Sequence, residues 1–372
     1  MKKRVVHFGG GALGRGLVVP LLVQSGCEVV LVDVDEKLLY EIKDQHGYSL
    51  LVTDEETNRQ QQFIPVKDVV SSLLEQKKLA TYLKEASVIT TAVRRENLIH
   101  VVNTLIGSLD GQQEKLVICA ENIENVNHYF NELLHQAAKT EAQRKVANSL
   151  VVPDTIVDRI CSSDWPSSLQ INTETFHELA VDQSLVPETH LSLIPAVENI
   201  DAAFARKRLM VNTYADAASF FALAAGKSYL HEAVTDETIQ QHLAPYFVGF
   251  RKLLEEKYQY TAEELADWHQ IYTKRLSNPK IKRELNSVAR NLWEKMTLKE
   301  RFIWPLLELL DLKVDVADSV RVLIDLIKCS SNESDQVIQT KLKKLWSTDA
   351  RGSVLYKIAE DYLAVPSSEE NE

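Results

Sequence analysis

Residues 4–14 read RVVHFGGGALG, and the architecture of the chain can be inferred outward from them. The apolar, β-branched run Arg4–Phe8 predicts a short buried strand. An apolar pattern with helical spacing follows from about Leu13 to Gln24, so the glycines form a turn that joins a strand to a helix. Because these glycines interrupt the apolar run, a strand is the better interpretation than a signal peptide.

The glycines of this turn have the spacing G-x-G-x-x-G, which is typical of dinucleotide binding when it joins a strand to a helix. Gly9 permits the tight turn, Gly11 lets the backbone approach a pyrophosphate, and Gly14 lets the helix pack closely on the strand. The helix N-terminus offers unpaired N–H groups and the positive end of its dipole to the phosphates.

Asp33 supplies the acidic residue that this motif requires. It directly follows the second predicted strand, Glu28–Val32, about 20 residues after the glycines. A carboxylate there accepts hydrogen bonds from the adenosine ribose and repels a 2′-phosphate, which favours NAD over NADP as the cofactor. The alternative is that Asp33 caps the helix predicted over Glu36–Gln45.

Strand and helix patterns alternate through the first half of the chain, which predicts βαβ units and a largely parallel sheet. Further strands are predicted over 63–70, 87–91 and 116–119, and further helices over 96–109 and 125–140. From about 198 to 363 the chain is rich in Leu, Ala, Lys and Glu at helical spacing. We therefore predict an α/β N-terminal domain with a Rossmann-type doubly wound sheet, residues 1–180, and a mainly α-helical C-terminal domain, residues 181–372.

Composition narrows the classes of function. The chain has 372 residues and a formal net charge of −11 without a long basic run, which argues against nucleic acid or an anionic membrane as a partner. No apolar run approaches the ~20 residues that span a bilayer. The four cysteines are far apart, with no histidine at metal-ligand spacing, so we expect reduced thiols, a cytoplasmic location and no metal site.

Eight segments of the chain form an ordered set. They are HFGGGALGRG at 7–16, DV at 33–34, TTAV at 90–93, EN at 121–122, VDRI at 157–160, ETF at 174–176, K-x4-NT at 207–213, and NP at 278–279. Their order and spacing resemble the polyol-specific long-chain dehydrogenases, the mannitol dehydrogenase family, over about the first 310 residues. The resemblance implies an NAD-dependent oxidoreductase that needs no metal and interconverts mannitol 1-phosphate and fructose 6-phosphate.

The resemblance also implies which residues act. Lys207 is the general acid/base, while Asn212 and Asn122 hydrogen-bond the reacting oxygen as charge develops on it. The residues implied to hold the cofactor are Gly9, Gly11, Leu13, Gly14, Arg15, Asp33, Thr91, Ala92 and Val93. Without the resemblance, Lys207 reads as a solvated helix residue and Asn122 as the cap of the following helix, and both alternatives stay open.

The chain departs from the family near these residues. Ala215 stands where the family has a histidine that helps to hold the substrate oxygen and the lysine, and Tyr214 replaces a glycine. Arg94 and Arg95 replace a glycine and a proline. Either the enzyme is slower, or another group such as Tyr214 or Asp216 substitutes, or the substrate differs.

A sugar phosphate needs a cationic clamp. Arg290 and Lys295 fall where the family has basic residues, but Glu294 stands where another basic residue is usual. Most other Lys and Arg side chains of this region read as a solvated helix face.

Three functions stay open at this point. The favoured one is an NAD-dependent dehydrogenase that interconverts a polyol phosphate and a ketose phosphate. The alternatives are a dehydrogenase of another polyol or of a sugar acid, and a catalytically impaired NAD-binding paralogue. We expect the active site in the cleft between the two domains, and we favour a monomer.

Overall fold

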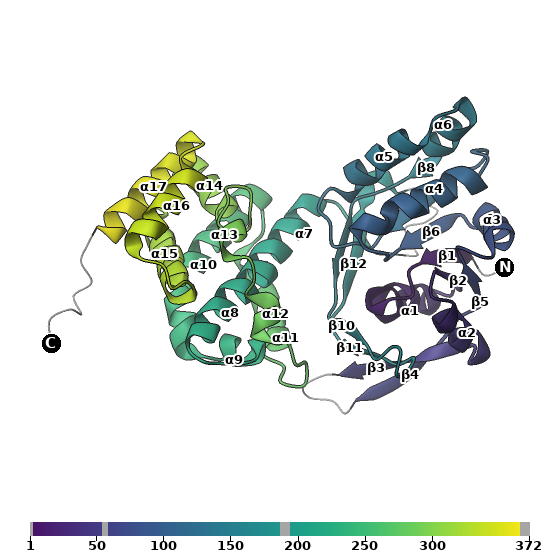
Figure 1. Ribbon diagram of the computed structural model, residues 1–372, viewed down its shortest axis with the longest axis horizontal. Helices are drawn as coiled ribbons and strands as arrows, with labels where there is room; N and C mark the ends of the chain where they lie inside the picture. The colour runs from purple at the N-terminus through teal and green to yellow at the C-terminus, as the bar shows by residue number, and fades with distance from the viewer. Residues whose placement is uncertain (1–2, 54–58, 187–193, 365–372) are drawn as a thin grey trace. The chain divides into compact units, whose positions relative to one another are not determined.

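A computed structural model describes residues 3–53, 59–186 and 194–364 of the protein. The chain divides into two units, Met1–Ile200 and Asp201–Glu372, which are treated separately below (Figure 1). The predicted boundary after residue 180 falls inside a strand of the first unit, β12 (Glu178–Asp182). That unit continues beyond 180 because β12 pairs with a later strand, β13 (Ala196–Val197).

The first unit is built on a parallel sheet with the strand order β5-β2-β1-β6-β7-β8. Its strands are β1 Arg4–Phe8, β2 Glu28–Asp33, β5 Asp68–Ser71, β6 Val88–Thr91, β7 Lys115–Cys119 and β8 Leu150–Val151. This order confirms the predicted Rossmann-type doubly wound sheet. Because the order reverses between β1 and β6, the carboxyl ends of these two strands form the edge where ligands bind in such sheets.

Both faces of this sheet are buried. Val5 and Val29 point into one apolar core, whereas their neighbours Val6 and Val30 point into another. The first core is covered by the π-helical segment η1 (Gly14–Val18) with α1 (Val19–Gln24) and α2 (Glu36–Asp44). The second is covered by α3 Gln76–Glu85, α4 Leu98–Ser108, α5 Val126–Ala137 and α6 Glu141–Asn148 (Figure 1).

Two smaller sheets complete the first unit. One has the order β10-β11-β3-β4 and the other the order β13-β12-β9. Their remaining strands are β3 Gly47–Thr53, β4 Gln60–Pro65, β9 Thr155–Asp158, β10 Cys161–Ser163 and β11 Ile171–Glu174. Short 3-10 turns lie at η2 Arg95–Asn97 and η3 Gln183–Leu185.

The single strand predicted over 63–70 is wrong. β4 ends at Pro65 and pairs antiparallel with β3, whereas β5 starts at Asp68 and pairs parallel with β2. Lys67 between them donates its N–H to the Val29 carbonyl oxygen at 2.9 Å, which brings the chain into the parallel sheet. One apolar run thus serves two sheets.

The second unit is helical, as predicted. Its elements are α7 Ile200–Lys207, η5 Arg208–Thr213, α8 Tyr214–Ala224, α9 Leu230–Val234, α10 Glu237–Tyr258, α11 Ala262–Leu276, α12 Leu285–Val288, α13 Leu292–Lys295, α14 Trp304–Asp311, α15 Ala317–Ser330, α16 Asp335–Trp346 and α17 Ala350–Leu363 (Figure 1). α8, α10 and α15 contribute Phe220, Phe250 and Leu323 to one core. The π-helical segment η5 joins α7 to α8 without a turn between them.

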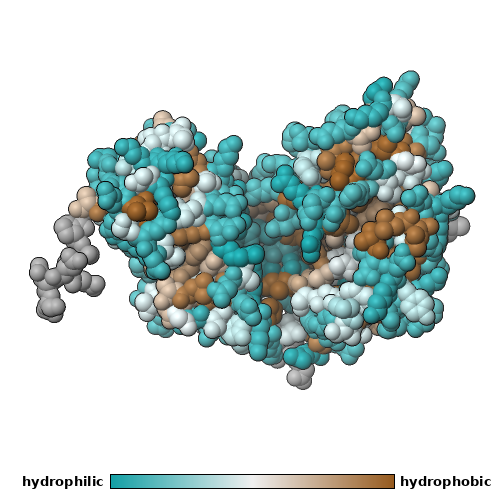
Figure 2. All heavy atoms as spheres, viewed as in Figure 1, coloured by the Kyte–Doolittle hydropathy of each residue, from teal (hydrophilic) through white to brown (hydrophobic). Residues whose placement is uncertain are grey.

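Hydrophilic side chains cover most of the surface in Figure 2, with smaller apolar areas between them. Among the residues that the structure describes, no helix is both long and apolar enough to cross a bilayer.

Candidate functional site

The glycine turn has the geometry that each glycine position requires. Gly9 has φ +108°, and a Cβ atom there would lie 2.4 Å from the Ala92 carbonyl oxygen. A Cβ atom on Gly14 would lie 2.1 Å from the Gly9 carbonyl oxygen, so the helix start packs directly against the turn. A Cβ atom on Gly11 would meet nothing within 4 Å. The turn is therefore closed toward the protein and open at Gly11, which fits the approach of a dinucleotide.

Arg15 is buried and supports this turn from inside. Its Nε donates to the Gly10 carbonyl oxygen at 2.6 Å, and its two terminal nitrogens donate to Leu169 O at 2.8 Å and Ser163 Oγ at 2.9 Å. All three nitrogens thus bind protein atoms and tie the glycine turn to the β10–β11 sheet. Leu13, which the resemblance also implies to hold the cofactor, is partly buried against the apolar core.

The alternative for Asp33 is settled by its neighbour. Asp35 caps α2, because its carboxylate accepts from the Leu38 N–H at 3.0 Å. Asp33 instead accepts from the Gly10 N–H at 2.6 Å and, through its other oxygen, from the N–H groups of Val34 and Asp35. Its carboxylate therefore lies beside the glycine turn, where the remaining lone pair of Oδ2 is left for a ribose hydroxyl.

The implied residues Thr91, Ala92 and Val93 lie around a buried carboxyl group. Glu121 accepts from Thr91 Oγ1 at 2.7 Å and from the Val93 N–H at 2.8 Å. Burial raises the pKa of Glu121, although these hydrogen bonds act in the opposite direction. Glu121 thus fixes the chain that follows β6. Glu121 belongs to the family segment at 121–122, but its role could not be predicted from the sequence.

His7 is a second residue whose role the sequence did not reveal. Its ring is fully buried in β1, with Nε2 3.0 Å from the Gly9 carbonyl oxygen and Nδ1 2.8 Å from Thr90 Oγ1. A carbonyl only accepts, so Nε2 carries the proton, and Nδ1 of the neutral ring accepts from the threonine hydroxyl. Burial lowers the pKa of His7 to about 4. The neutral imidazole thereby links β1, β6 and the glycine turn.

Asn122 is exposed and follows Glu121 at the carboxyl end of β7. The N-cap position of α5 is Asn125, three residues later, and the Asn125 side chain makes no capping hydrogen bond. Asn122 belongs to the first unit, whereas Lys207 and Asn212 belong to the second.

In the second unit, the π-helical segment brings Lys207 and Asn212 onto one side of the same helix. Residues five apart are one turn apart in a π-helix, as residues four apart are in an α-helix. Thr213 shows this register, because its Oγ1 donates to the Arg208 carbonyl oxygen, five residues back, at 2.7 Å. Lys207 is 7% exposed, so it is not a solvated surface residue. Asn212 is half-buried.

The arginines that flank Lys207 point to other partners. Arg206 lies over the Trp268 ring, with its guanidinium carbon 3.7 Å from the ring centroid, and donates to Tyr272 Oη at 3.1 Å. Arg208 donates to the Lys299 carbonyl oxygen at 2.7 Å. Their guanidinium groups thus bind α11 and the chain before α14.

Ala215, at the family's histidine position, is buried beside an acid that holds two cations. Asp216 Oδ2 lies 3.0 Å from Lys295 Nζ and 3.0 Å from Arg301 Nη1. Lys295, which we predicted to bind a substrate phosphate, therefore already pairs with Asp216. Arg290 is exposed.

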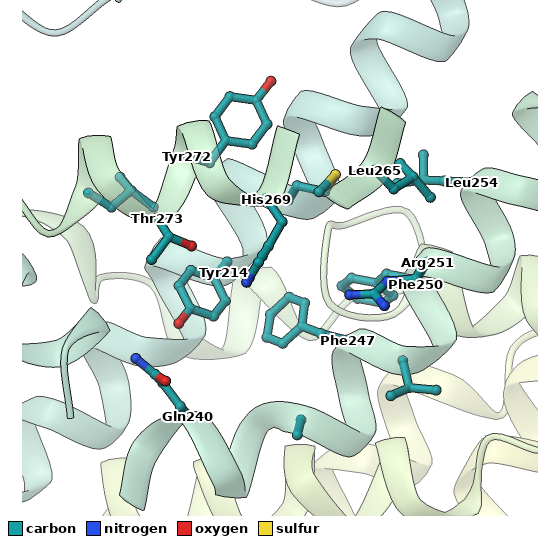
Figure 3. Close-up of a pocket in the computed structure, with 14 residues that line it drawn as sticks. Tyr214, Gln240, Phe247, Phe250, Arg251, Leu254, Leu265, His269, Tyr272 and Thr273 are labelled. Carbon is teal, nitrogen blue, oxygen red and sulfur yellow. The ribbon is translucent and has the colours of Figure 1, made fainter. Parts of the chain in front are cut away.

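A cavity of about 340 Å³ lies between η5–α8, α10 and α11 (Figure 3). Tyr214 lines it and meets the Phe247 ring edge-on, with centroids 5.0 Å apart. In Figure 3 His269 and Thr273 point toward Tyr214, whereas Tyr272 points away. Burial lowers the pKa of His269, and the charge of Arg251 adds to this shift. No spacing in the chain places His269 beside Tyr214, the tyrosine that replaces a family glycine.

No group of three or more His, Cys, Asp or Glu residues that could hold a metal ion occurs within 3–53, 59–186 and 194–364.

Two family models match the chain. Residues 3–194 match the Rossmann domain of mannitol dehydrogenases, and residues 199–346 match the C-terminal domain of mannitol dehydrogenases. The chain is also similar to proteins called mannitol-1-phosphate 5-dehydrogenase. The one from an Exiguobacterium species is 31% identical over 83% of this chain and 80% of that protein. The one from Talaromyces marneffei is 26% identical over 83% and 81%, respectively.

Solved structures show the same fold. A D-sorbitol dehydrogenase in substrate-free form matches with a TM-score of 0.79 and 13% identity, over 97% of this chain and 93% of that chain. Pseudomonas fluorescens mannitol 2-dehydrogenase, in a ternary complex with NAD and D-mannitol, matches with a TM-score of 0.68 and 13% identity, over 98% and 92%. At this identity the two likenesses bear on the fold alone.

Proposed function

The chain belongs to the mannitol dehydrogenase family, and we propose that it is an NAD-dependent polyol dehydrogenase acting on CH–OH groups. We propose further that it interconverts mannitol 1-phosphate and fructose 6-phosphate, with Lys207 as the general acid/base. The observation that carries this proposal is the π-helical turn that aligns the buried Lys207 with Asn212 in the second unit.

The first unit supplies the cofactor half of the proposal. The turn is open at Gly11, and Asp33 lies beside it, so the residues present fit a dinucleotide with an unmodified ribose. When bound, NAD supplies or accepts the hydride. His7, Arg15 and Glu121 hold the turn and the chain after β6 in place before the cofactor arrives.

Two side chains of the second unit carry the proposed chemistry at the reacting oxygen. In the reducing direction the protonated Lys207 donates to the ketose oxygen, and in the oxidising direction the neutral amine accepts the hydroxyl proton. The amide N–H group of Asn212 donates to the same oxygen as negative charge develops on it. One such donor typically contributes about 10²–10³ in rate.

Phosphate recognition is the finer part of the proposal. Asp216 neutralises one of the two positive charges of Lys295 and Arg301, so this cluster keeps a net charge of +1. We assign the phosphate of the substrate to this cluster and to the exposed Arg290.

A cytoplasmic location agrees with the four free cysteines. A monomer of 42.1 kDa is proposed, and light scattering tests it.

The test of this function is a substrate panel. NADH oxidation is followed at neutral pH with fructose 6-phosphate, free fructose and a set of sugar acids with a keto group. We expect turnover with fructose 6-phosphate and at least tenfold lower kcat/KM with free fructose. If the protein binds NADH but turns over no ketose phosphate, the proposed activity is wrong and the impaired paralogue is favoured. Turnover of free polyols alone would support the other dehydrogenase.

A further inference from the structure

Arg94 has a backbone conformation that residues other than glycine rarely adopt. It follows β6 with φ 72° and ψ 154°, a region that is essentially open only to glycine. Asn125, Gln259 and Asn291 also have positive φ, but their ψ values of 44°, 25° and 47° place them in the ordinary left-handed region. The surroundings of Arg94 therefore hold it in a strained state.

Contacts on both sides of β6 fix the chain that leads to Arg94. The Ala92 N–H donates to the Phe8 carbonyl oxygen at 2.8 Å, and the Val93 N–H donates to the Glu121 carboxylate at 2.8 Å. The Ala92 carbonyl oxygen also lies against Gly9, where a Cβ atom would approach it to 2.4 Å. Arg94 therefore leaves the sheet two residues after the segment that touches the glycine turn. This is the edge at which the strand order reverses.

The Arg94 guanidinium has no partner among the residues that the structure describes. The Arg94 side chain is exposed, and its guanidinium makes no hydrogen bond or ion pair with any residue that the structure describes. The neighbouring Arg95 differs, because its guanidinium carbon lies 4.5 Å from the centroid of the Tyr129 ring. Backbone strain at a residue whose guanidinium has no partner among the described residues points to a ligand.

We propose that Arg94 binds the diphosphate of the dinucleotide. The proposal rests on the proposed NAD-dependent function, since it needs this cofactor at the β1–β6 edge. A guanidinium matches a phosphate group with two parallel N–H donors, and the diphosphate is the anion that a glycine turn at this edge receives. Arg94 follows β6 and Gly11 follows the neighbouring strand β1, so both residues lie at the carboxyl-end edge of the sheet where the strand order reverses.

Three variants separate this contact from strain and from general charge. Arg94→Gly removes both the cation and the strain, and Arg94→Lys keeps a charge without the fork of donors. Arg95→Ala removes the adjacent cation and serves as the matched control. Each purified full-length protein is titrated with NADH, with ADP-ribose, which keeps the diphosphate, and with adenosine, which lacks it. Thermal unfolding of each variant without ligand is measured alongside.

For Arg94→Gly we expect the dissociation constants of NADH and ADP-ribose to rise roughly tenfold, with adenosine unchanged. The same variant is expected to unfold at a higher temperature, because glycine relieves the strain. Arg94→Lys recovers part of the affinity, and Arg95→Ala binds all three ligands like the wild type.

Equal NADH affinity in Arg94→Gly and the wild type would overturn the proposal. An effect limited to the KM of fructose 6-phosphate would also overturn it, because the charge would then serve the substrate. An equal loss of affinity in Arg95→Ala would show a general field instead of a contact. These outcomes differ from failure of the proposed function, in which the wild type itself does not bind NADH.

Discussion

Lys207 is the residue on which the proposed chemistry depends. Replacement by alanine removes the proton donor but leaves the first unit, which holds the dinucleotide turn, unchanged. We expect Lys207→Ala to lower kcat at least 10³-fold while the dissociation constant of NADH changes less than twofold. Lys207→Arg is the matched control for charge, and it stays inactive because a guanidinium does not give up its proton near neutral pH. Activity within tenfold of the wild type in Lys207→Ala would remove the lysine from the mechanism.

Ala215 tests whether the site keeps the geometry of the family. An imidazole at this position follows Asn212 by three residues and so lies on the same side of the helix. We expect Ala215→His to raise kcat/KM for fructose 6-phosphate, measured by NADH oxidation. Ala215→Leu, of comparable bulk, serves as the control and is expected to give no gain. A gain in both variants would attribute the effect to packing.

His7 gives the stability of the protein a dependence on pH. Its pKa is about 4 in the folded protein and 6.5 as the ordinary value, so the unfolded chain binds the proton more tightly. The contribution of His7 is therefore complete above pH 6.5 and is lost as the pH falls toward 4. We expect this residue to remove roughly 3 kcal/mol of unfolding free energy across that window.

The measurement for His7 is urea unfolding at several pH values between 4 and 7, for the wild type and for His7→Gln. The variant is less stable throughout, but it should lose less unfolding free energy than the wild type as the pH falls. Parallel curves for the two proteins would show that His7 does not stay neutral in the folded state.

At the scale of elements, the glycine turn separates a structural role from a binding role. Gly14→Ala places Cβ 2.1 Å from the Gly9 carbonyl oxygen and 2.5 Å from His7 Nε2, two atoms that are hydrogen-bonded to each other. We expect the free energy of unfolding of Gly14→Ala to be about 1–3 kcal/mol lower than that of the wild type. Gly11→Ala meets no atom within 4 Å, so it should keep its stability and lose NADH affinity.

Thermal unfolding and NADH titration of the two glycine variants provide the check. The expected pattern is a destabilised Gly14→Ala and a stable Gly11→Ala with weakened binding. A Gly11→Ala protein that binds NADH like the wild type would mean that the diphosphate does not approach this part of the backbone.

The elements show how far the sequence leads. Period and turn residues predicted the parallel sheet and the helical second half, because buried strands and amphipathic helices have distinct spacings. They failed over 63–70, because this run forms two strands in different sheets, and Lys67 between the strands hydrogen-bonds to β2. They also give no reason to pair Lys207 with Asn212, because residues five apart are turned about 140° from each other in an α-helix. The π-helical segment removes that separation.

At the scale of the whole molecule, the ordered motifs predicted the family, but they did not predict which charged side chains pair with each other. The sequence placed Lys295 among the phosphate ligands because of its position in the chain. The structure pairs it with Asp216, a contact between distant segments that no local spacing reveals. The strain at Arg94 and the buried imidazole of His7 also depend on the packed sheet. Both units match the family models, so the reaction has to be tested with the full-length chain.

The most direct test of the account follows the hydrogen that is transferred. The full-length protein is incubated with fructose 6-phosphate and NADH deuterated at C4 on each face in turn, and the product is analysed by mass spectrometry and NMR. We predict mannitol 1-phosphate with one deuterium, from one face only, on the carbon that was the ketone, and no such product from Lys207→Ala. NADH binding by the wild type without deuterium in any polyol phosphate would contradict the account.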